Sequence, residues 1–315
     1  MQTIQAPRAA AILYGLLTSR GQAGPWLLPA NICPIVPAVF MKAGVAFELV
    51  DISDATLHMD LEQAEERLRR GKLGGILFAH TYGEASTPND FFARVKAHDP
   101  EVLVIDDRCL CPPDLDAPDT LVADVALYST GHAKHVELGF GGYAFMQAGL
   151  RYVAASLPFD PAQHAALEAS YKASIQARSR FDYGADDWLE VNTPQPTWSD
   201  YRQQLAAGLE RSTEQRRLLS AVYAHELPTE MQLPPAYQTW RFNVRVKNQR
   251  RILAAIFAEG LFASAHYASL GGIMAAGRYP RAEALAGGIL NLFIDHHFTV
   301  DQAERTCAVI RANDR

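Results

Sequence analysis

The sequence predicts an α/β fold, in which a mostly parallel sheet is flanked by helices and a smaller α+β domain follows at the C-terminal end. Two observations support this prediction. Short apolar, β-branched runs alternate with helix-like segments from residue 8 to about residue 147, and such alternation is typical of parallel strands joined by helices. Two long helical segments and a Pro-containing linker come next, and shorter mixed elements follow them. A chain of 315 residues, 49% of them hydrophobic, can bury a large core.

The first half of the chain is expected to contribute the main sheet. The run Val102–Ile105 is apolar at every position, as expected for a strand that is buried on both faces. We expect helices at 8–19, 34–43, 60–70 and 88–97, and strands at 26–29, 46–50, 74–79, 101–105 and 122–128.

The second half is expected to begin with two long helices. Asp160-Pro161 opens the first, over 162–182, and Thr197 to Asp200 opens the second, over 199–225. Between them lies the stiff segment Asn192–Pro196, which we interpret as the passage toward the smaller domain. The predicted domains are therefore 1–190 and 191–315, and the second contains extended segments at 240–246 and 290–294 and helices at 248–259 and 300–311.

Two predicted strands bring polar side chains to the same edge of the sheet. One run ends in Asp106 and Asp107, and the other ends in Ser129-Thr130-Gly131, shortly before Lys134. Open α/β sheets bind ligands at the carboxyl ends of their strands. A lysine amine can form a Schiff base with an aldehyde, and pyridoxal phosphate (PLP) is the cofactor that most often uses this reaction, with an acid beside its pyridinium nitrogen. By themselves, these residues fit either a PLP site or a solvated loop that carries a surface cation.

A family pattern favours the first interpretation. The segment from Asp106-Asp107 through Tyr128–Lys134 to Gly141-Gly142 resembles the DegT/DnrJ/StrS family of PLP-dependent sugar aminotransferases, whose pattern runs from an acidic pair through F-S-x-x-x-[TA]-K to Gly-Gly. The resemblance implies the type I fold of PLP-dependent transferases. It extends in the right order over most of the chain, through residues 26–52, 75–83, 262–267 and 291–299.

The resemblance also implies roles for individual residues. Lys134 would carry the Schiff base, Asp107 would pair the pyridine nitrogen, and Ser129 would contact the phosphate, whereas Asp106 is expected to be structural. The start of the first helix would hold the phosphate through backbone N–H groups, and Arg8 and Ala9 lie at this start.

Several positions depart from the family pattern. Pro7 lacks an N–H at the expected phosphate site, and Cys33 stands where many members place an aromatic ring that stacks on the pyridine. Leu110 replaces a frequent Gln near the cofactor, and Phe140 replaces the usual Glu before the double glycine. His80 ends an apolar strand, so that it either faces the cofactor or bonds a neighbouring loop.

The resemblance implies transfer of an amino group from an amino acid, by analogy glutamate, to a keto sugar that is usually nucleotide-linked, in a biosynthetic pathway. A homodimer is expected because active sites in this family borrow residues across the interface. One alternative is another PLP reaction such as dehydration, although relatives that dehydrate sugars often have His at the lysine position. The other is a non-catalytic member, which the departures favour and the presence of Lys134 and Asp107 disfavours.

Composition limits partners and compartment. The net charge of −6 argues against nucleic acid as a general partner. No stretch approaches about 18 consecutive apolar residues, so no membrane span is expected. Four cysteines without a disulfide framework favour a reducing compartment, and we expect the cytoplasm. No metal site is expected, because His296-His297 lacks a recognisable third ligand and Cys109-x-Cys111 fits strand-end packing. His132 and His135 flank Lys134 and are expected to be solvated.

Overall fold

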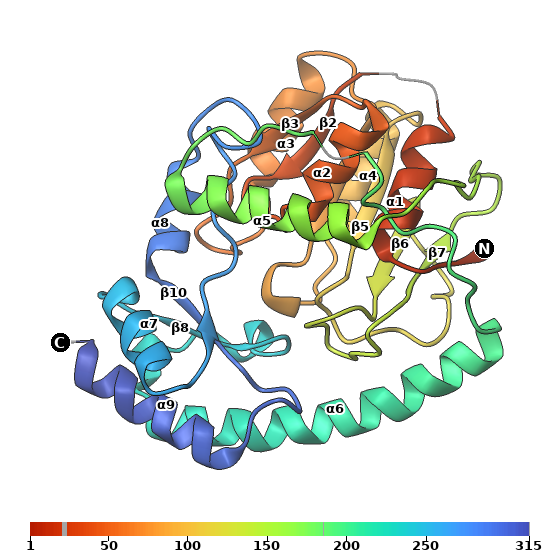
Figure 1. Ribbon diagram of the computed structural model, residues 1–315. Helices are drawn as coiled ribbons and strands as arrows, with labels where there is room; N and C mark the ends of the chain where they lie inside the picture. Colours follow the sequence, from red (N-terminus) through yellow and green to blue (C-terminus); the bar gives the residue numbers. More distant parts are fainter. Residues whose placement is uncertain (21–23, 185, 315) are drawn as a thin grey trace.

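The larger of the two sheets confirms the predicted α/β architecture. The computed structural model describes residues 1–20, 24–184 and 186–314 (Figure 1). In these residues the larger sheet has seven strands, five of which (β2 to β6) run parallel, while β7 is antiparallel to both of its neighbours. The order across the sheet is β1 (Gln2–Ala6), β7 (Gly142–Met146), β6 (Val125–Ser129), β5 (Leu103–Asp107), β4 (Gly75–Ala79), β2 (Trp26–Pro29) and β3 (Phe47–Val50).

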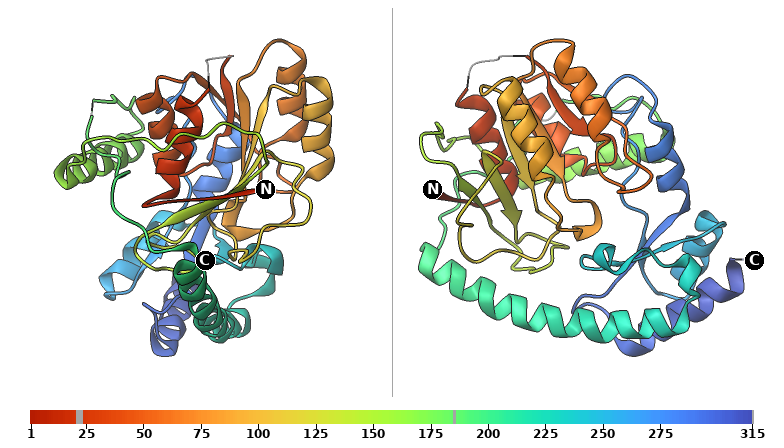
Figure 2. Two further views of the ribbon diagram at one scale, coloured as in Figure 1. Left: turned by 90° about the vertical axis from the view of Figure 1, so that its right-hand side faces the viewer. Right: turned by 180° about the vertical axis from the view of Figure 1, so that it is seen from behind.

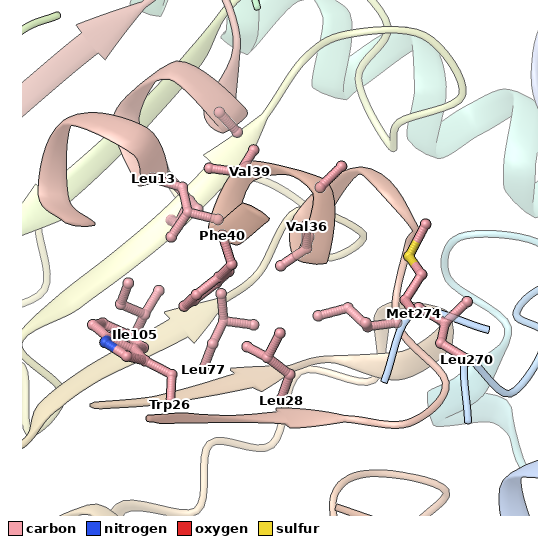
Figure 3. Close-up of a cluster of buried hydrophobic side chains, with 14 of the residues drawn as sticks. Leu13, Trp26, Leu28, Val36, Val39, Phe40, Leu77, Ile105, Leu270 and Met274 are labelled. Atoms are coloured by element: carbon pink, nitrogen blue, oxygen red, sulfur yellow. The ribbon is translucent and has the colours of Figure 1, made fainter. Parts of the chain in front are cut away.

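Helices cover both faces of this sheet because successive strand residues point to opposite sides. Leu28, Leu77 and Ile105 join one buried cluster with α1 (Ala9–Thr18) and α2 (Ile35–Ala43), as Figure 3 shows. The adjacent residues Leu27, Ile76 and Val104 join another cluster with α3 (Leu61–Arg69) and α4 (Asn89–His98). The carboxyl ends of the strands remain available for a site.

The smaller sheet lies at the far end of a long helix. Its strands are β8 (Phe242–Arg245), β10 (Ile289–Leu292) and β9 (Ala263–Ser264), in that order. Two helices, α7 (Gln249–Ala258) and α9 (Val300–Asn313), pack with this sheet around a separate buried cluster. The long helix α6 (Trp198–Glu226) runs from the region of the larger sheet to this cluster, as Figures 1 and 2 show.

Some elements differ from those expected. The edge strand β1 and helix α8 (Pro280–Gly288) were not predicted, and α5 (Pro161–Ala177) ends five residues before the expected end at 182. This helix ends because Arg178 adopts a left-handed conformation with φ of 52°.

One C-terminal segment packs on the larger core. Leu270 and Met274 lie beside the cluster around α2 (Figure 3), and the Leu270 N–H donates to the carbonyl of Ala30 at 2.9 Å. The boundary between 190 and 191 therefore stays a prediction, with residues of the second half contributing to the first core. Within the described ranges, no helix combines the length and the apolar character needed to cross a membrane.

Candidate active site

A cavity of about 300 Å³ lies at the carboxyl ends of β4, β5 and β6, beside the start of α1. Side chains from segments far apart in the sequence line it, as expected for a site at this edge of an open sheet. All the residues singled out as candidates in the sequence are among them, namely Arg8, Ala9, Cys33, His80, Asp107, Ser129 and Lys134.

The two acids at the end of β5 have different surroundings. Asp107 lines the cavity and is 8% exposed, and its Oδ1 accepts the N–H of Cys109 at 3.0 Å. Asp106 does not line the cavity: its Oδ1 lies 2.6 Å from His80 Nε2, and Arg108 lies near its Oδ2. The carboxylate of Asp107 is therefore the one that can reach a ligand in the cavity.

The backbone around Lys134 is fixed from three directions. Ala133 has a positive φ of 56°, and its N–H donates to Glu137 Oε2 at 2.9 Å. The indole of Trp240 donates to the carbonyl of Ala133 at 2.7 Å, and the buried Arg216 donates to the carbonyl of Lys134 at 3.1 Å. In the part of the chain that the structure describes, the Lys134 amine itself has no hydrogen-bond or ion-pair partner, so it is free to react with a ligand.

The other end of the cavity suits an anion. Helix α1 begins at Ala9 with no side-chain cap and no acid in its first turn, so its first N–H groups and its dipole favour a negative charge. A Cβ placed on Gly131 would lie 3.6 Å from Arg8 Nη1 and 3.7 Å from Ser129 Oγ. A guanidinium and a hydroxyl therefore flank Gly131 near the helix start, where a phosphate would gain charge-assisted hydrogen bonds.

A wall of the cavity, which sequence reasoning missed, comes from α5 and the segments before and after it. Glu190 Oε2 accepts from Arg8 Nε at 3.0 Å. On α5, the neighbouring His164 and Lys172 lower the pKa of Glu168 to about 2, so this carboxylate is ionised at neutral pH. The residues of this wall are Phe159, His164, Glu168, Tyr171, Trp188, Leu189 and Glu190.

Two cysteines form uncharged parts of the lining. Burial raises the pKa of the Cys33 thiol and raises that of Cys109 well above its usual value. Both thiols stay protonated at neutral pH and present small, weakly polar surfaces. Cys33 supplies no ring where the family resemblance implies one, but the rings of Tyr171 and Tyr267 reach the cavity from other elements.

The histidines near the cavity differ in environment. His80 lines the cavity but has acceptors at both nitrogens, Glu84 O at 2.6 Å from Nδ1 and Asp106 at Nε2. His132 is exposed, as expected. The prediction of a solvated His135 is wrong: it is buried, its Nδ1 donates to a backbone carbonyl at 3.2 Å, and burial and a nearby arginine lower its pKa to about 3.

Comparison with known proteins identifies the fold. No protein-family model and no curated protein sequence matches the chain. Solved structures do match: a DegT DnrJ EryC1 StrS aminotransferase from Brucella abortus has 18% identity and a TM-score of 0.69, with 99% of this chain and 86% of that chain covered. Spr1654 from Streptococcus pneumoniae, in its PLP form, has 17% identity and a TM-score of 0.68, with coverage of 98% and 87%.

DesI, solved in the presence of its TDP-sugar product, has 17% identity and a TM-score of 0.72 over 99% of this chain and 80% of that chain. The fold is therefore that of these aminotransferases, as the family resemblance implied.

Proposed function

We propose that this protein is a PLP-dependent aminotransferase that moves an amino group from an amino acid to a keto sugar. The observation that carries the proposal is one cavity that contains the carboxylate of Asp107, the uncapped start of α1 and the amine of Lys134, which has no partner among the described residues. These are the three groups that PLP needs, for its aldehyde, its pyridine nitrogen and its phosphate. The likeness to structures solved in PLP and PMP forms supports this choice.

The residues fit the cofactor at both ends of the cavity. Lys134 would hold it through the amine, Asp107 through the ring nitrogen, and the phosphate would lie between Arg8, Ser129 and the N–H of Ala9. Tyr171 and Tyr267 supply apolar ring surface. When bound, PLP supplies an aldehyde that condenses with amines and a ring that withdraws electrons.

The residues of the chain would then move the protons. The Lys134 amine would take the proton from the α-carbon of the amino-acid donor and return a proton on the other side of the donor's nitrogen, as general base and general acid. The carboxylate of Asp107 would accept a hydrogen bond from the ring nitrogen and so hold a proton there. Because one lysine serves both halves of the reaction at one site, donor product leaves before the acceptor binds, and ping-pong kinetics are expected.

The visible absorption spectrum tests the proposal. Purified protein with added PLP is expected to show an absorption band that Lys134→Ala removes and that L-glutamate bleaches in the wild type. Lys172→Ala is the matched control, because Lys172 is an exposed lysine on α5 that pairs with Glu168 beside the cavity. Its band should equal that of the wild type.

Other spectra would contradict the proposal. A band of full strength in Lys134→Ala would place the cofactor on another lysine. A band that glutamate, other amino donors and a keto sugar all leave unchanged would favour another PLP reaction, and no band at all in the wild type would favour a non-catalytic binding protein.

The finer parts of the proposal are glutamate as donor, a nucleotide-linked acceptor, a homodimer and a cytoplasmic location. The TDP-sugar product of DesI supports the acceptor. The free state of Cys33, Cys109, Cys111 and Cys307 supports a reducing compartment. Parallel double-reciprocal lines with glutamate and a TDP-keto sugar would be expected, and intersecting lines would refute the ping-pong order.

A further inference from the structure

The long helix α6 follows the loop that carries Lys134. This loop, residues 130–141, connects β6 to β7 and is called the lysine loop. Four residues of α6 contact it, namely Tyr201, Gly208, Ser212 and Arg216. They are seven or four residues apart, a spacing that places them on one face of a helix. The approach is close, since a Cβ built on Gly208 would lie 2.5 Å from Val136 Cγ1. The lysine loop therefore rests on α6.

Arg216 holds the main chain of the lysine loop at the lysine itself. Its Nη2 donates to the carbonyls of Lys134 at 3.1 Å and of His135 at 3.3 Å. Its Nη1 donates to the carbonyl of Trp240, and its Nε donates to Ser212 Oγ at 2.9 Å. One planar guanidinium thus joins the lysine loop to α6 and to the segment that enters β8. A lysine side chain could not replace it, because all its donors lie on one nitrogen atom.

Arg216 is charged but has no acid paired with it. It is buried, and although burial and the nearby Arg241 lower its pKa to about 10, it stays protonated at neutral pH. In the described part of the chain, no carboxylate forms an ion pair with it. A buried charge is costly unless hydrogen bonds replace its lost water, and here backbone carbonyls provide them. Moving the lysine loop away from α6 would leave this charge unsatisfied, so the loop is held in place.

Trp240 holds the same loop from a second element. Its indole donates to the carbonyl of Ala133 at 2.7 Å, so that the three consecutive carbonyls of 133–135 are bound by two side chains. The Trp240 ring also stacks on Tyr267, with 6.0 Å between the ring centroids, and Tyr267 lines the cavity. The Lys134 amine, by contrast, has no partner among the described residues. Its position in the cavity therefore depends on the main chain that these two side chains hold.

We propose that Arg216 is a positioning residue for Lys134, whose amine it aims at the place where the aldehyde of bound PLP would lie. This inference rests on the proposed function. Arg216 itself does not line the cavity, so it acts on the lysine only through the main chain. A displacement of about 1 Å can cost a reaction about 100-fold in rate. Loss of the planar fork should therefore slow the reaction of Lys134 with PLP and leave in place the groups that bind PLP.

The kinetics of PLP uptake test this inference. Protein freed of PLP is mixed with PLP at several concentrations, and the growth of the absorption band is followed by stopped flow. Arg216→Lys keeps the positive charge but not the planar fork, so the maximal rate should fall about 10–100-fold. The PLP concentration that gives half of this rate should stay within about twofold of the wild-type value. Arg217→Lys is the matched control, because Arg217 is exposed and pairs with Glu214. It should behave like the wild type.

Hydrogen exchange in the protein freed of PLP is a second measurement that needs no bound cofactor. The N–H groups of Ala133 and Leu138 are hydrogen-bonded within the lysine loop, to Glu137 and to the carbonyl of Thr130. In Arg216→Lys they should exchange about tenfold faster, since the loop has lost a hydrogen bond to a charged group. The amides of β5 should exchange as in the wild type, which shows that the variant is folded.

A milder variant covers the case in which Arg216→Lys does not fold. Ser212→Ala removes the hydroxyl that accepts from Arg216 and donates to the carbonyl of His135. It should change the maximal rate of PLP uptake and the hydrogen exchange in the same direction, by about threefold. Wild-type values of both in Ser212→Ala would then overturn the inference.

Other results separate this inference from the proposed function. The inference is overturned if Arg216→Lys takes up PLP at the wild-type maximal rate, or if only the half-saturating PLP concentration rises. The absence of a band in the wild type would instead overturn the proposed function. Hydrogen exchange would then decide whether Arg216 holds the lysine loop, and unchanged exchange in Arg216→Lys would overturn that part as well.

Discussion

The contact between β7 and the start of α1 can be tested by adding one methyl group. A Cβ built on Gly142 would lie 2.2 Å from the nitrogen and 2.5 Å from the Cα of Ala9. These distances are at least about 1 Å shorter than ordinary contact between non-bonded atoms. Both atoms of Ala9 belong to the backbone, so no side-chain rotation can relieve the clash. In Gly142→Ala, the strand or the helix start must move.

The expected cost follows from this geometry. Overpacking usually costs about 1–3 kcal/mol, and we expect the upper part of this range because backbone must shift. Urea unfolding of Gly142→Ala should therefore give a free energy of unfolding about 2–3 kcal/mol below that of the wild type. The same shift moves the Ala9 N–H and Arg8 relative to Ser129. We expect PLP to bind about tenfold more weakly, which corresponds to one lost charge-assisted hydrogen bond of about 1.5 kcal/mol.

Gly287→Ala is the matched control. Gly287 lies in α8, and a Cβ there would have no neighbour within 4 Å, so the same substitution should stabilise the protein by about 0.5–1 kcal/mol. It should leave the affinity for PLP unchanged. If Gly142→Ala unfolds at the same urea concentration as the wild type, α1 does not rest on β7 and the proposed phosphate site loses its basis.

Three further changes test other parts of the structure. Glu190→Gln frees Arg8 from its ion pair and should tighten PLP binding about two- to fivefold, the equivalent of ~0.4–1 kcal/mol, in a titration followed by absorbance. Weaker binding would contradict a competing role for Glu190. Because the pKa of His135 is lowered in the folded protein, the unfolded chain binds one more proton below about pH 6.5, and the free energy of unfolding decreases by about 1.4 kcal/mol for each unit by which the pH is lowered. His135→Gln should reduce this slope in urea unfolding between about pH 6 and about pH 5. An unchanged slope would refute the assignment. Thr299→Ala removes the capping box of α9 and should cost about 1 kcal/mol of stability without changing the PLP spectrum; an altered spectrum would show that α9 reaches the site.

Local sequence patterns predicted the helices and strands whose own residues show how they are buried or capped. The apolar run that became β5 had to be buried on both faces, and Thr197 caps α6 as expected. β1 was missed because it is a half-exposed edge strand, and its pairing with β7 joins Gln2 to Met146, far along the chain. Helix α8 was missed for a similar reason: only Ala282 and Leu285 are buried along its length, so its sequence shows a weak apolar face.

The same holds for the candidate site: residues with a local sequence signal were predicted, and residues that reach the cavity through distant contacts were not. The residues singled out in sequence follow strand ends or begin a helix, and topology brings such positions to one edge of the sheet. The wall formed by α5 was not predictable in this way. Asp160 and Pro161 signal the start of α5, but Leu167 and Tyr171 alone are buried in it, and nothing near them in sequence indicates what they cover. The ion pair of Glu190 with Arg8 likewise joins residues that are 182 positions apart in the sequence.

The acidic pair at the end of β5 shows how two neighbouring carboxylates come to have different partners. Successive residues of a strand point to opposite faces, so Asp107 follows Ile105 toward the cavity beside α1, and Asp106 follows Val104 toward the side of α3 and α4. One carboxylate is then available to a pyridine nitrogen and the other to His80. Moving the register of β5 by one residue would exchange these roles, so the pairing of β5 with β4 and β6 determines the chemistry on both faces.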